Sequence, residues 1–291
     1  MQQFRPGGFN MLPVVVKNLL IINGLFFLAT IALKTSMNIN LNDILGLHYY
    51  LADNFKSWQF VTYMFMHAAI DPDGGGLIIT HILFNMFALW MFGNVLENYW
   101  GPKRFLFYYL FTGIGAGIVH YFVFYFQFTP LLETINSYIA SPSHNELTDF
   151  LSSSNFKIIS KEWYNKDYKQ FIENYNRLIN TDKYEAMQLS INFMSQYKVD
   201  LLNASVVVGA SGAVFGILLA FGMMFPNSLI YVYFAIPVKA KYFVMIYGAI
   251  ELYSGIANNP GDNVAHFAHL GGMIFGYLII LYWKKKGTLY N

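Results

Sequence analysis

The sequence lacks cysteine entirely and has few charged residues. With no thiol among its 291 residues, the chain can form no disulfide, no thiolate nucleophile and no cysteine-ligated metal site. Charged residues make up 12% of the sequence, against about a quarter in soluble globular domains, whereas apolar residues make up 56%. This composition excludes an ordinary soluble enzyme and predicts a chain that is integral to a membrane.

Long apolar runs recur along the chain. A membrane-spanning helix needs about 20 mostly apolar residues, because it rises about 1.5 Å per residue. We therefore predict an all-α, polytopic membrane protein whose six spans cover about residues 12–33, 77–96, 105–126, 204–225, 241–257 and 265–283. The first run is followed by no small-residue cleavage site, so we expect a retained span rather than a signal peptide. The shorter apolar stretches 58–66 and 229–236 are expected to lie at the membrane surface or, for the first, to dip into it.

The spans divide the chain into three parts. Residues 1–126 hold spans one to three with the first outer loop, residues 127–202 form a polar extracytoplasmic insertion, and residues 203–291 hold spans four to six and a cytoplasmic tail. Apolar residues recur at helical spacing over 168–179 and 187–201, which predicts a helical insertion. Ser143 and Glu146 have the spacing of a capping box at the start of one such helix.

Lysine and arginine are distributed unevenly between the two sides of these spans. On the side of the two termini lie Arg5, Lys17, Lys103, Arg104, Lys239, Lys241 and Lys284 to Lys286. The opposite side has Lys34 and Lys56 in its first loop and no cation in its last loop, 258–264. Because short cytoplasmic loops are enriched in cations, we predict that both termini are cytoplasmic. The absence of organelle-targeting features favours a bacterial plasma membrane.

The fourth predicted span begins with small residues around a serine, Gly209-Ala210-Ser211-Gly212. Taken alone, this motif favours close helix packing, since Gly212 and Gly216 have the small-x-x-x-small spacing of packed membrane helices. It also differs from the nucleophile elbow of soluble hydrolases, which needs a glycine where this chain has Ala213.

Polar residues also lie near the starts of the second and sixth spans. His81 and Asn85 share one helix face, where they could simply join helices by hydrogen bonding. His269 lies within the sixth span, where histidine is costly and indicates a functional site by default, whereas His266 also fits a position at the membrane interface.

The predicted topology places these polar residues at one depth. Spans two, four and six all enter from the outside, so His81, Asn85, Ser211 and His269 lie early in their spans. Unrelated packing residues would have no reason to share a depth. Serine becomes a nucleophile when a base such as histidine takes its proton, and side-chain or backbone N–H groups can bind an oxyanion. We predict Ser211 as nucleophile and His269 as base, with oxyanion binding by His81 and Asn85.

No acidic partner of His269 is evident in the sequence. Asp262, in the preceding loop, is the nearest acid and is interpreted as a solubility residue. We therefore predict a dyad without an orienting carboxylate and expect Phe215, one turn after Ser211, to support the imidazole by ring contact. Glu251 and His120 receive no role at this point.

The motifs resemble those of the rhomboid intramembrane serine proteases over about residues 12–126 and 203–283. They are Gly209-x-Ser211-Gly212, His81-x-x-x-Asn85, Ala268-His269-Leu270-Gly271-Gly272-x-x-x-Gly276, Phe92-Gly93 with Leu96-Glu97, and Gly101 to Arg104. The resemblance implies a six-helix bundle and hydrolysis of a peptide bond in or beside a substrate's membrane span. It implies the same roles for Ser211, His269, His81 and Asn85, a structural role for His67, and a substrate gate over residues 241–266.

Three features depart from the usual pattern of that family. Trp58 is followed by Gln59 where arginine is usual, which predicts a weaker loop anchor, and Phe215 stands where tyrosine is frequent. The insertion at 127–202 has no counterpart in the minimal pattern. Because it lies on the active-site side, we hypothesise that it restricts which substrates reach the serine.

The expected partners are transmembrane protein substrates and the lipid bilayer. We expect no nucleic acid, no metal and no organic cofactor, and the oligomeric state is left open. A transporter or proton relay using His120, His81, His269 and Glu251 is one alternative, but it predicts a symmetry between the halves that the sequence lacks. A catalytically inactive rhomboid relative is another, although such proteins usually lack the serine or the histidine.

Overall fold

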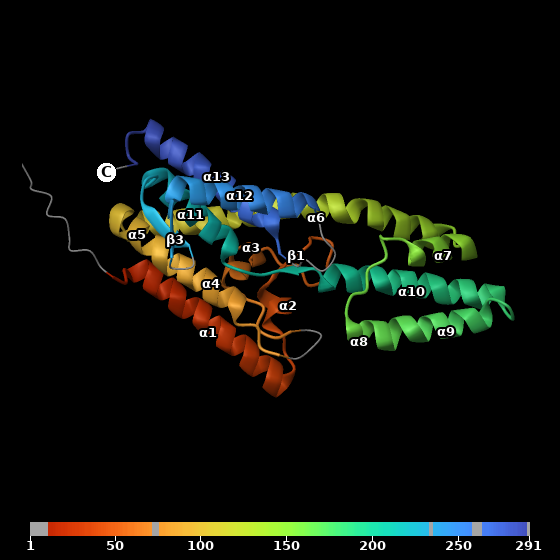
Figure 1. Ribbon diagram of the computed structural model, residues 1–291. Helices are drawn as coiled ribbons and strands as arrows, with labels where there is room; N and C mark the ends of the chain where they lie inside the picture. Colours follow the sequence, from red (N-terminus) through yellow and green to blue (C-terminus); the bar gives the residue numbers. More distant parts are fainter. Residues whose placement is uncertain (1–10, 72–75, 233–234, 258–263, 290–291) are drawn as a thin grey trace, which may run out of the picture.

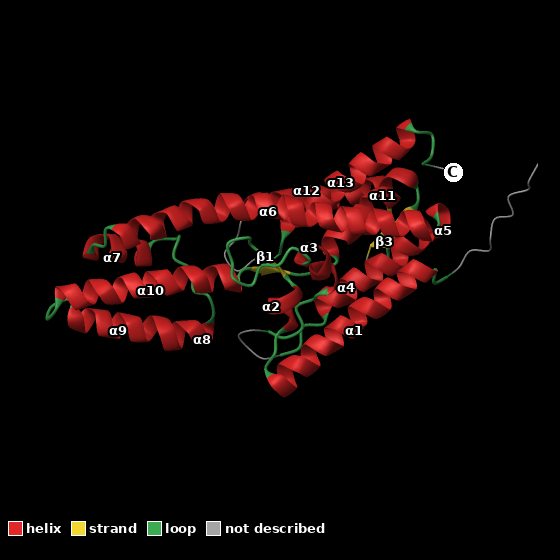
Figure 2. Cartoon of the chain, turned by 180° about the vertical axis from the view of Figure 1, so that it is seen from behind, coloured by secondary structure: helices red, strands yellow, loops and turns green. Residues whose placement is uncertain are grey.

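The computed structural model describes residues 11–71, 76–232, 235–257 and 264–289 (Figure 1). Arg5, Asp262 and most of the predicted last outer loop, 258–264, lie outside these residues. The described chain is mostly helical, as predicted, and its few strands are short (Figure 2).

The elements follow one another in this order. They are α1 (Val14–Met37), α2 (Leu41–Leu45), β1 (Leu47–His48), α3 (Gln59–Thr62), the 3-10 turn η1 (Tyr63–Phe65), α4 (Thr80–Ala88), the π-helical turn η2 (Leu89–Gly93), α5 (Asn94–Trp100), α6 (Pro102–Ala140), α7 (His144–Ser152), α8 (Lys161–Trp163), the π-helical turn η3 (Tyr164–Tyr168), α9 (Lys169–Leu178), α10 (Lys183–Ala204), β2 (Val206–Val207), α11 (Ser211–Met224), β3 (Leu229–Val232), β4 (Ile236–Lys239), α12 (Ala240–Ala257) and α13 (His266–Lys285).

Three of the described helices, α1, α6 and α13, are long and apolar enough to cross a membrane. They contain the first, third and sixth predicted spans. The second predicted span corresponds to α4, η2 and α5, which follow one another without a break from Thr80 to Trp100. The fifth corresponds to α12.

The predicted boundary at residue 127 does not coincide with a break in the chain. Helix α6 continues through it to Ala140 and includes Pro130. Its far end packs against α10, where the Tyr138 hydroxyl donates to Ser190 Oγ over 2.6 Å. Tertiary packing of this kind extends a helix beyond its apolar stretch. Figure 1 shows α6 and α10 extending together to the end of the molecule where α7 and α9 lie.

The helices α7 to α10 pack on one another through aromatic side chains. Phe171 of α9 and Phe193 of α10 stack with ring centroids 3.8 Å apart, and the Tyr197 hydroxyl accepts the backbone N–H of Lys157 over 2.9 Å. The Ser143 side chain accepts the backbone N–H of Glu146 at the start of α7. The helical character of this region and the predicted cap are therefore both present in the structure.

The fourth predicted span, 204–225, is helical only from Ser211 onward. Helix α10 ends at Ala204, and between it and Ser211 strand β2 pairs with β1 of the first loop in an antiparallel register that places Val206 opposite His48. Helix α11 has 14 residues and is too short to cross a bilayer core of about 30 Å by itself. Non-helical backbone at membrane depth is tolerated where it is buried in protein, and Val207, Gly209 and Ala210 of this stretch are buried.

Small residues allow α11 to lie close to its neighbours. A Cβ added at Gly212 would meet the Cβ of Ala116 in α6, and one added at Gly272 of α13 would meet the backbone carbonyl of Gly212. A Cβ at Gly216 would meet Thr112 of α6. The predicted role of the glycine spacing in helix packing is therefore confirmed.

Gln59 is fully buried in the first loop and holds it together. Its Oε1 accepts backbone N–H groups of His48 and Lys56 over 3.3 and 3.1 Å, and its Nε2 donates to the carbonyls of Ile44 and Asn54 over 3.1 and 2.8 Å. Gln59 therefore does anchor the loop, because its amide offers both donors and acceptors to backbone groups that need both; that this anchor is weaker than arginine stays a prediction.

The stretch 229–236, which we expected as a turn segment resting on the membrane surface, instead forms part of a β-hairpin. Strands β3 and β4 form an antiparallel hairpin that pairs Leu229 with Lys239. Leu229, Tyr231 and Ile236 are exposed, whereas Ile230 is buried. Alternate exposure is the pattern of a strand, and it was hidden in a continuous apolar run.

Candidate active site

Ser211 is the first residue of α11, directly after an unusual turn. Gly209 has a φ of 132°, which side chains with a Cβ rarely adopt. Its N–H donates to the carbonyl of Tyr63 over 2.9 Å, and the Tyr63 hydroxyl donates to the carbonyl of Gly113 over 2.7 Å. The first loop and α6 therefore hold the backbone that presents Ser211.

Ser211 and His269 meet across α11 and α13. Ser211 Oγ lies 2.8 Å from Nε2 of His269, although the two residues are 58 positions apart in the chain. His269 is buried, with 8% of its surface exposed. A hydroxyl that donates to an imidazole in this way is the arrangement of an activated serine.

Glu251 also contacts His269, contrary to the prediction of a dyad. Its Oε2 lies 2.8 Å from Nδ1 of His269 and 2.6 Å from Nδ1 of His266. With the carboxylate ionised, both imidazoles donate from Nδ1, so Nε2 of His269 can accept from Ser211. The carboxyl group comes from α12, and only the packing of α12 on α13 brings it to the site.

A sequence signal for this contact does exist. Gly248 and Gly255 lie three positions before and four positions after Glu251, so the three residues share one face of α12. A Cβ at Gly255 would lie 3.0 Å from the Phe267 ring, and one at Gly248 would lie 3.2 Å from Met273. This face of α12 packs on α13. The position of Glu251 between the two glycines was therefore a sequence signal that its carboxyl group faces a neighbouring helix.

Phe215 supports the imidazole as predicted. Its ring stacks on His269 with centroids 4.3 Å apart and an interplanar angle of 7°. Tyr247 of α12 stacks on Phe215 in turn, at 5.3 Å. The imidazole is therefore fixed by a ring contact as well as by its hydrogen bonds.

His81 borders the serine from α4. A Cβ added at Gly209 would lie 3.1 Å from Cε1 and Nε2 of His81 and 3.4 Å from Ser211 Oγ, so the His81 ring and the hydroxyl both border the same small space beside Gly209. Asn85, one turn further along α4, is buried and donates to the His81 carbonyl over 2.9 Å.

His67 packs behind this group. Its ring centroid lies 5.2 Å from that of His81 in an edge-to-face contact. His67 is fully buried, and neither ring nitrogen has a hydrogen-bond partner among the described residues. These contacts fit a residue that positions His81.

The only group of side chains in the described part of the chain that could hold a metal is Glu251, His266 and His269. Its nitrogen–oxygen distances of 2.6 and 2.8 Å are hydrogen-bond lengths. Ligand atoms about 2.0–2.1 Å from a tetrahedral zinc would lie about 3.3 Å apart. In the structure these three side chains are joined by hydrogen bonds.

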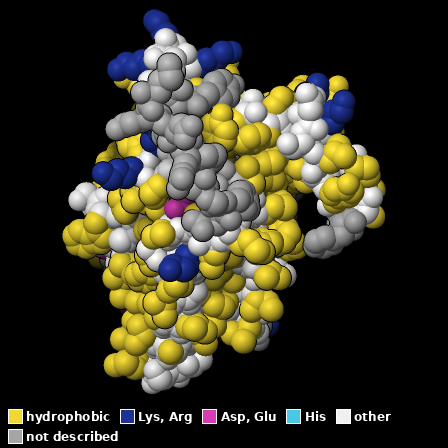
Figure 3. Space-filling view, turned by 90° about the vertical axis from the view of Figure 1, so that its left-hand side faces the viewer, with side chains coloured by type: hydrophobic (Ala, Val, Ile, Leu, Met, Phe, Trp, Pro, Cys, Tyr) yellow, Lys and Arg dark blue, Asp and Glu magenta, His cyan; other side chains and the backbone are white. Residues whose placement is uncertain are grey.

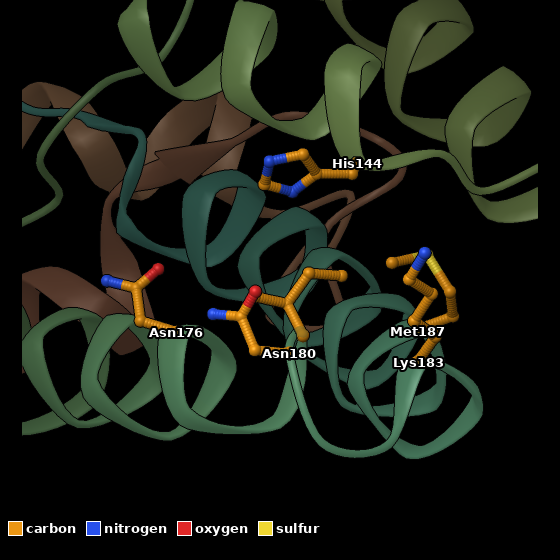
Figure 4. Close-up of a pocket in the computed structure, with 6 residues that line it drawn as sticks. His144, Asn176, Asn180, Lys183 and Met187 are labelled. Atoms are coloured by element: carbon orange, nitrogen blue, oxygen red, sulfur yellow. The ribbon is translucent and has the colours of Figure 1, made fainter.

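Two cavities are lined by histidines to which the sequence analysis gave no catalytic role. A small one of about 60 Å³ is lined by His120 of α6, by Ser254 of α12 and by His266. A larger hollow of about 670 Å³ lies between α7, α9 and α10, and Figure 4 shows His144, Asn176, Asn180, Lys183 and Met187 around it. None of the predicted site residues lines this larger hollow.

The fold and the site define an integral membrane protein in which a serine at the start of α11 contacts a histidine in the first turn of α13. A family model described as "Rhomboid domain" matches residues 54–129 and 181–286, more than half of the chain. The chain therefore belongs to the rhomboid family. The two matched stretches leave residues 130–180 between them.

A curated relative matches a shorter part. The chain is similar to "Rhomboid-like protein 11, chloroplastic" from Arabidopsis thaliana, with 34% identity over 103 residues. This match covers 35% of the chain and 34% of the relative, so it spans about a third of either protein.

Proposed function

We propose that the protein is an intramembrane serine endopeptidase that hydrolyses peptide bonds in or beside the transmembrane segments of other membrane proteins. The observation that carries the proposal is the 2.8 Å contact between Ser211 Oγ and His269 Nε2. Membership of the rhomboid family supports it, because serine intramembrane proteolysis is the activity that the resemblance implies.

In the proposed reaction, Ser211 Oγ bonds to the carbonyl carbon of the scissile peptide while its proton passes to Nε2 of His269. His269 then gives that proton to the leaving amine as the C–N bond breaks, and an acyl-enzyme remains. Water, deprotonated by the same imidazole, attacks the ester carbonyl. The acid product leaves, and the proton returns to Ser211.

The negative charge that develops on the carbonyl oxygen needs hydrogen-bond donors. The proposal gives this role to His81 and Asn85, with the backbone N–H groups at the start of α11. The first N–H groups of a helix have no partner within the helix and lie at the positive end of its dipole. The His81 ring adjoins Gly209 and Ser211, which supports its assignment.

The proposed membrane arrangement has six spans, with both termini in the cytoplasm and the insertion outside. Figure 3 shows lysine and arginine side chains at the end of the molecule that lies on the left of Figure 1, and α7 and α9 lie at the opposite end. Helix α10 leads from that opposite end through β2 to Ser211. The site would then open to the outside, in a bacterial plasma membrane, toward substrates held in the lipid bilayer.

The test is fluorophosphonate labelling, with cleavage of a single-span model protein in liposomes. The wild type is expected to label and to cleave, whereas Ser211→Ala and His269→Ala should each lose more than about 10³-fold in rate. A folded wild type that neither labels nor cleaves would favour an inactive relative or a proton relay.

A further inference from the structure

We propose that Glu251 is a positioning residue that completes a serine–histidine–glutamate triad, and that His266 shares its carboxylate and so weakens the contact with His269. The inference rests on the proposed protease function. The three members come from three helices, with Ser211 on α11, His269 on α13 and Glu251 on α12.

The carboxylate is held from two sides. Oε2 accepts from Nδ1 of His269 at 2.8 Å and from Nδ1 of His266 at 2.6 Å. Two donors from adjacent turns of α13 fix the position of one oxygen. Glu251 is itself buried, and a buried carboxylate in a membrane helix is retained only where partners compensate its desolvation.

The surroundings of Glu251 on α12 set it apart from its neighbours. Met245, Ile250 and Tyr253 are exposed on this helix, and these apolar side chains suit a lipid-facing surface. Glu251 lies on the face packed against α13, between Gly248 and Gly255. The close approach at Gly255, 3.0 Å from a built Cβ to the Phe267 ring, allows the carboxylate to reach the start of α13.

The chemical role follows from this position. When Oε2 accepts the Nδ1 proton, His269 is kept in the tautomer whose Nε2 can take the Ser211 proton. The imidazolium formed during attack then lies next to a negative charge in a buried site, where that charge is more effective than in water. The carboxylate stays ionised throughout, and no proton is transferred to it.

The sharing of Oε2 predicts opposite effects for its two partners. His266 competes with His269 for the same oxygen, so loss of His266 should strengthen the hold of the carboxylate on His269. Two further titratable groups of the described residues, His81 from α4 and His120 from α6, interact electrostatically with His269. Both are unchanged in the variants below, so a shift can be assigned to the Glu251 group.

The experiment compares Glu251→Gln, Glu251→Asp, His266→Asn and the double variant Glu251→Gln/His266→Asn with the wild type in liposomes. Glu173→Gln, at an exposed carboxyl group of the insertion, is the matched control and should behave as wild type. For Glu251→Gln we expect a fall in kcat of about 10²- to 10⁴-fold with little change in KM. The acid limb of its pH–rate profile should move to lower pH, because the imidazolium of His269 loses a neighbouring negative charge. Glu251→Asp should recover part of the lost kcat and part of the pH shift.

His266→Asn should move the acid limb to higher pH, and this shift should vanish in the double variant. Thermal unfolding identifies variants that fail to fold; if Glu251→Gln does so, the pH profiles of Glu251→Asp and His266→Asn decide. A folded Glu251→Gln with wild-type kcat and pH profile would overturn the positioning role while leaving the protease proposal intact. A wild type without activity would overturn both, and activity lost in chelator and restored by zinc would replace the triad with a metal site.

Discussion

The imidazole of His269 lies almost parallel to the phenyl ring of Phe215, with 4.3 Å between ring centroids and 7° between planes. Tyr247 continues the stack on the other side of Phe215, and Phe243 continues it beyond Tyr247. Rings from α13, α11 and α12 therefore form one column beside the serine. His269 is positioned by apolar packing on its ring face and by hydrogen bonds at both ring nitrogens.

Replacement of Phe215 by leucine should slow the reaction without abolishing it. An aromatic pair contributes about 0.5–1.5 kcal/mol beyond its buried area, which corresponds to about a 2- to 12-fold fall in kcat. Phe215→Tyr keeps the ring and should retain most of the activity. Steady-state cleavage in liposomes provides the measurement, and equal activity of Phe215→Leu and wild type would show that the stack does not position His269.

The closest helix contact should be sensitive to a single methyl group. In Gly272→Ala, the new Cβ would meet the backbone carbonyl of Gly212, which cannot rotate away, so we expect a loss of about 1–3 kcal/mol in unfolding free energy. Gly24→Ala in α1 is the matched control, because a Cβ there meets nothing within 4 Å. Thermal unfolding in detergent should show a lower midpoint for the first variant and an unchanged or higher one for the second.

Gln59 should be needed for the first loop to keep its shape. In Gln59→Leu, the backbone groups of His48, Lys56, Ile44 and Asn54 lose their partner, and each buried group left unpaired costs about 1–3 kcal/mol. We expect faster limited proteolysis of this loop and a lower unfolding midpoint. Gln170→Leu, at an exposed position of α9, should change neither, and resistance of Gln59→Leu would contradict the anchoring role.

The hypothesis that the insertion restricts substrates can be tested without cutting α6 or α10. Replacing residues 141–182 by a short Gly/Ser linker removes α7 to α9 and leaves both long helices complete. The rate of fluorophosphonate labelling at Ser211 should stay within about 2-fold of wild type, while the set of cleaved single-span substrates should widen. Cleavage of every substrate at its original rate would refute the hypothesis.

Local periodicity and composition were sufficient to predict most of the long helices. The apolar runs predicted helices α1, α6, α12 and α13, and the spacing of Ser143 and Glu146 predicted a helix start. The same pattern failed where a run was apolar but not helical, at 205–210, and it gave no indication of the β3–β4 hairpin. At 205–210 the backbone pairs with the distant strand β1, and pairing of that kind leaves little trace in a short window. In the hairpin the alternation of a strand was hidden because both exposed and buried positions are apolar.

By itself, the sequence determined that this is a helical membrane protein, and that a serine, two histidines and an asparagine stand early in three helices, because hydrophobic length and residue spacing are properties of the chain. Only the tertiary structure decided that Glu251 joins His269 and that Gln59 replaces the expected anchor. Both depend on which faces of separate helices and loops meet. A side chain's partner is set by the rotation and approach of its helix, and those are fixed by packing over the whole bundle.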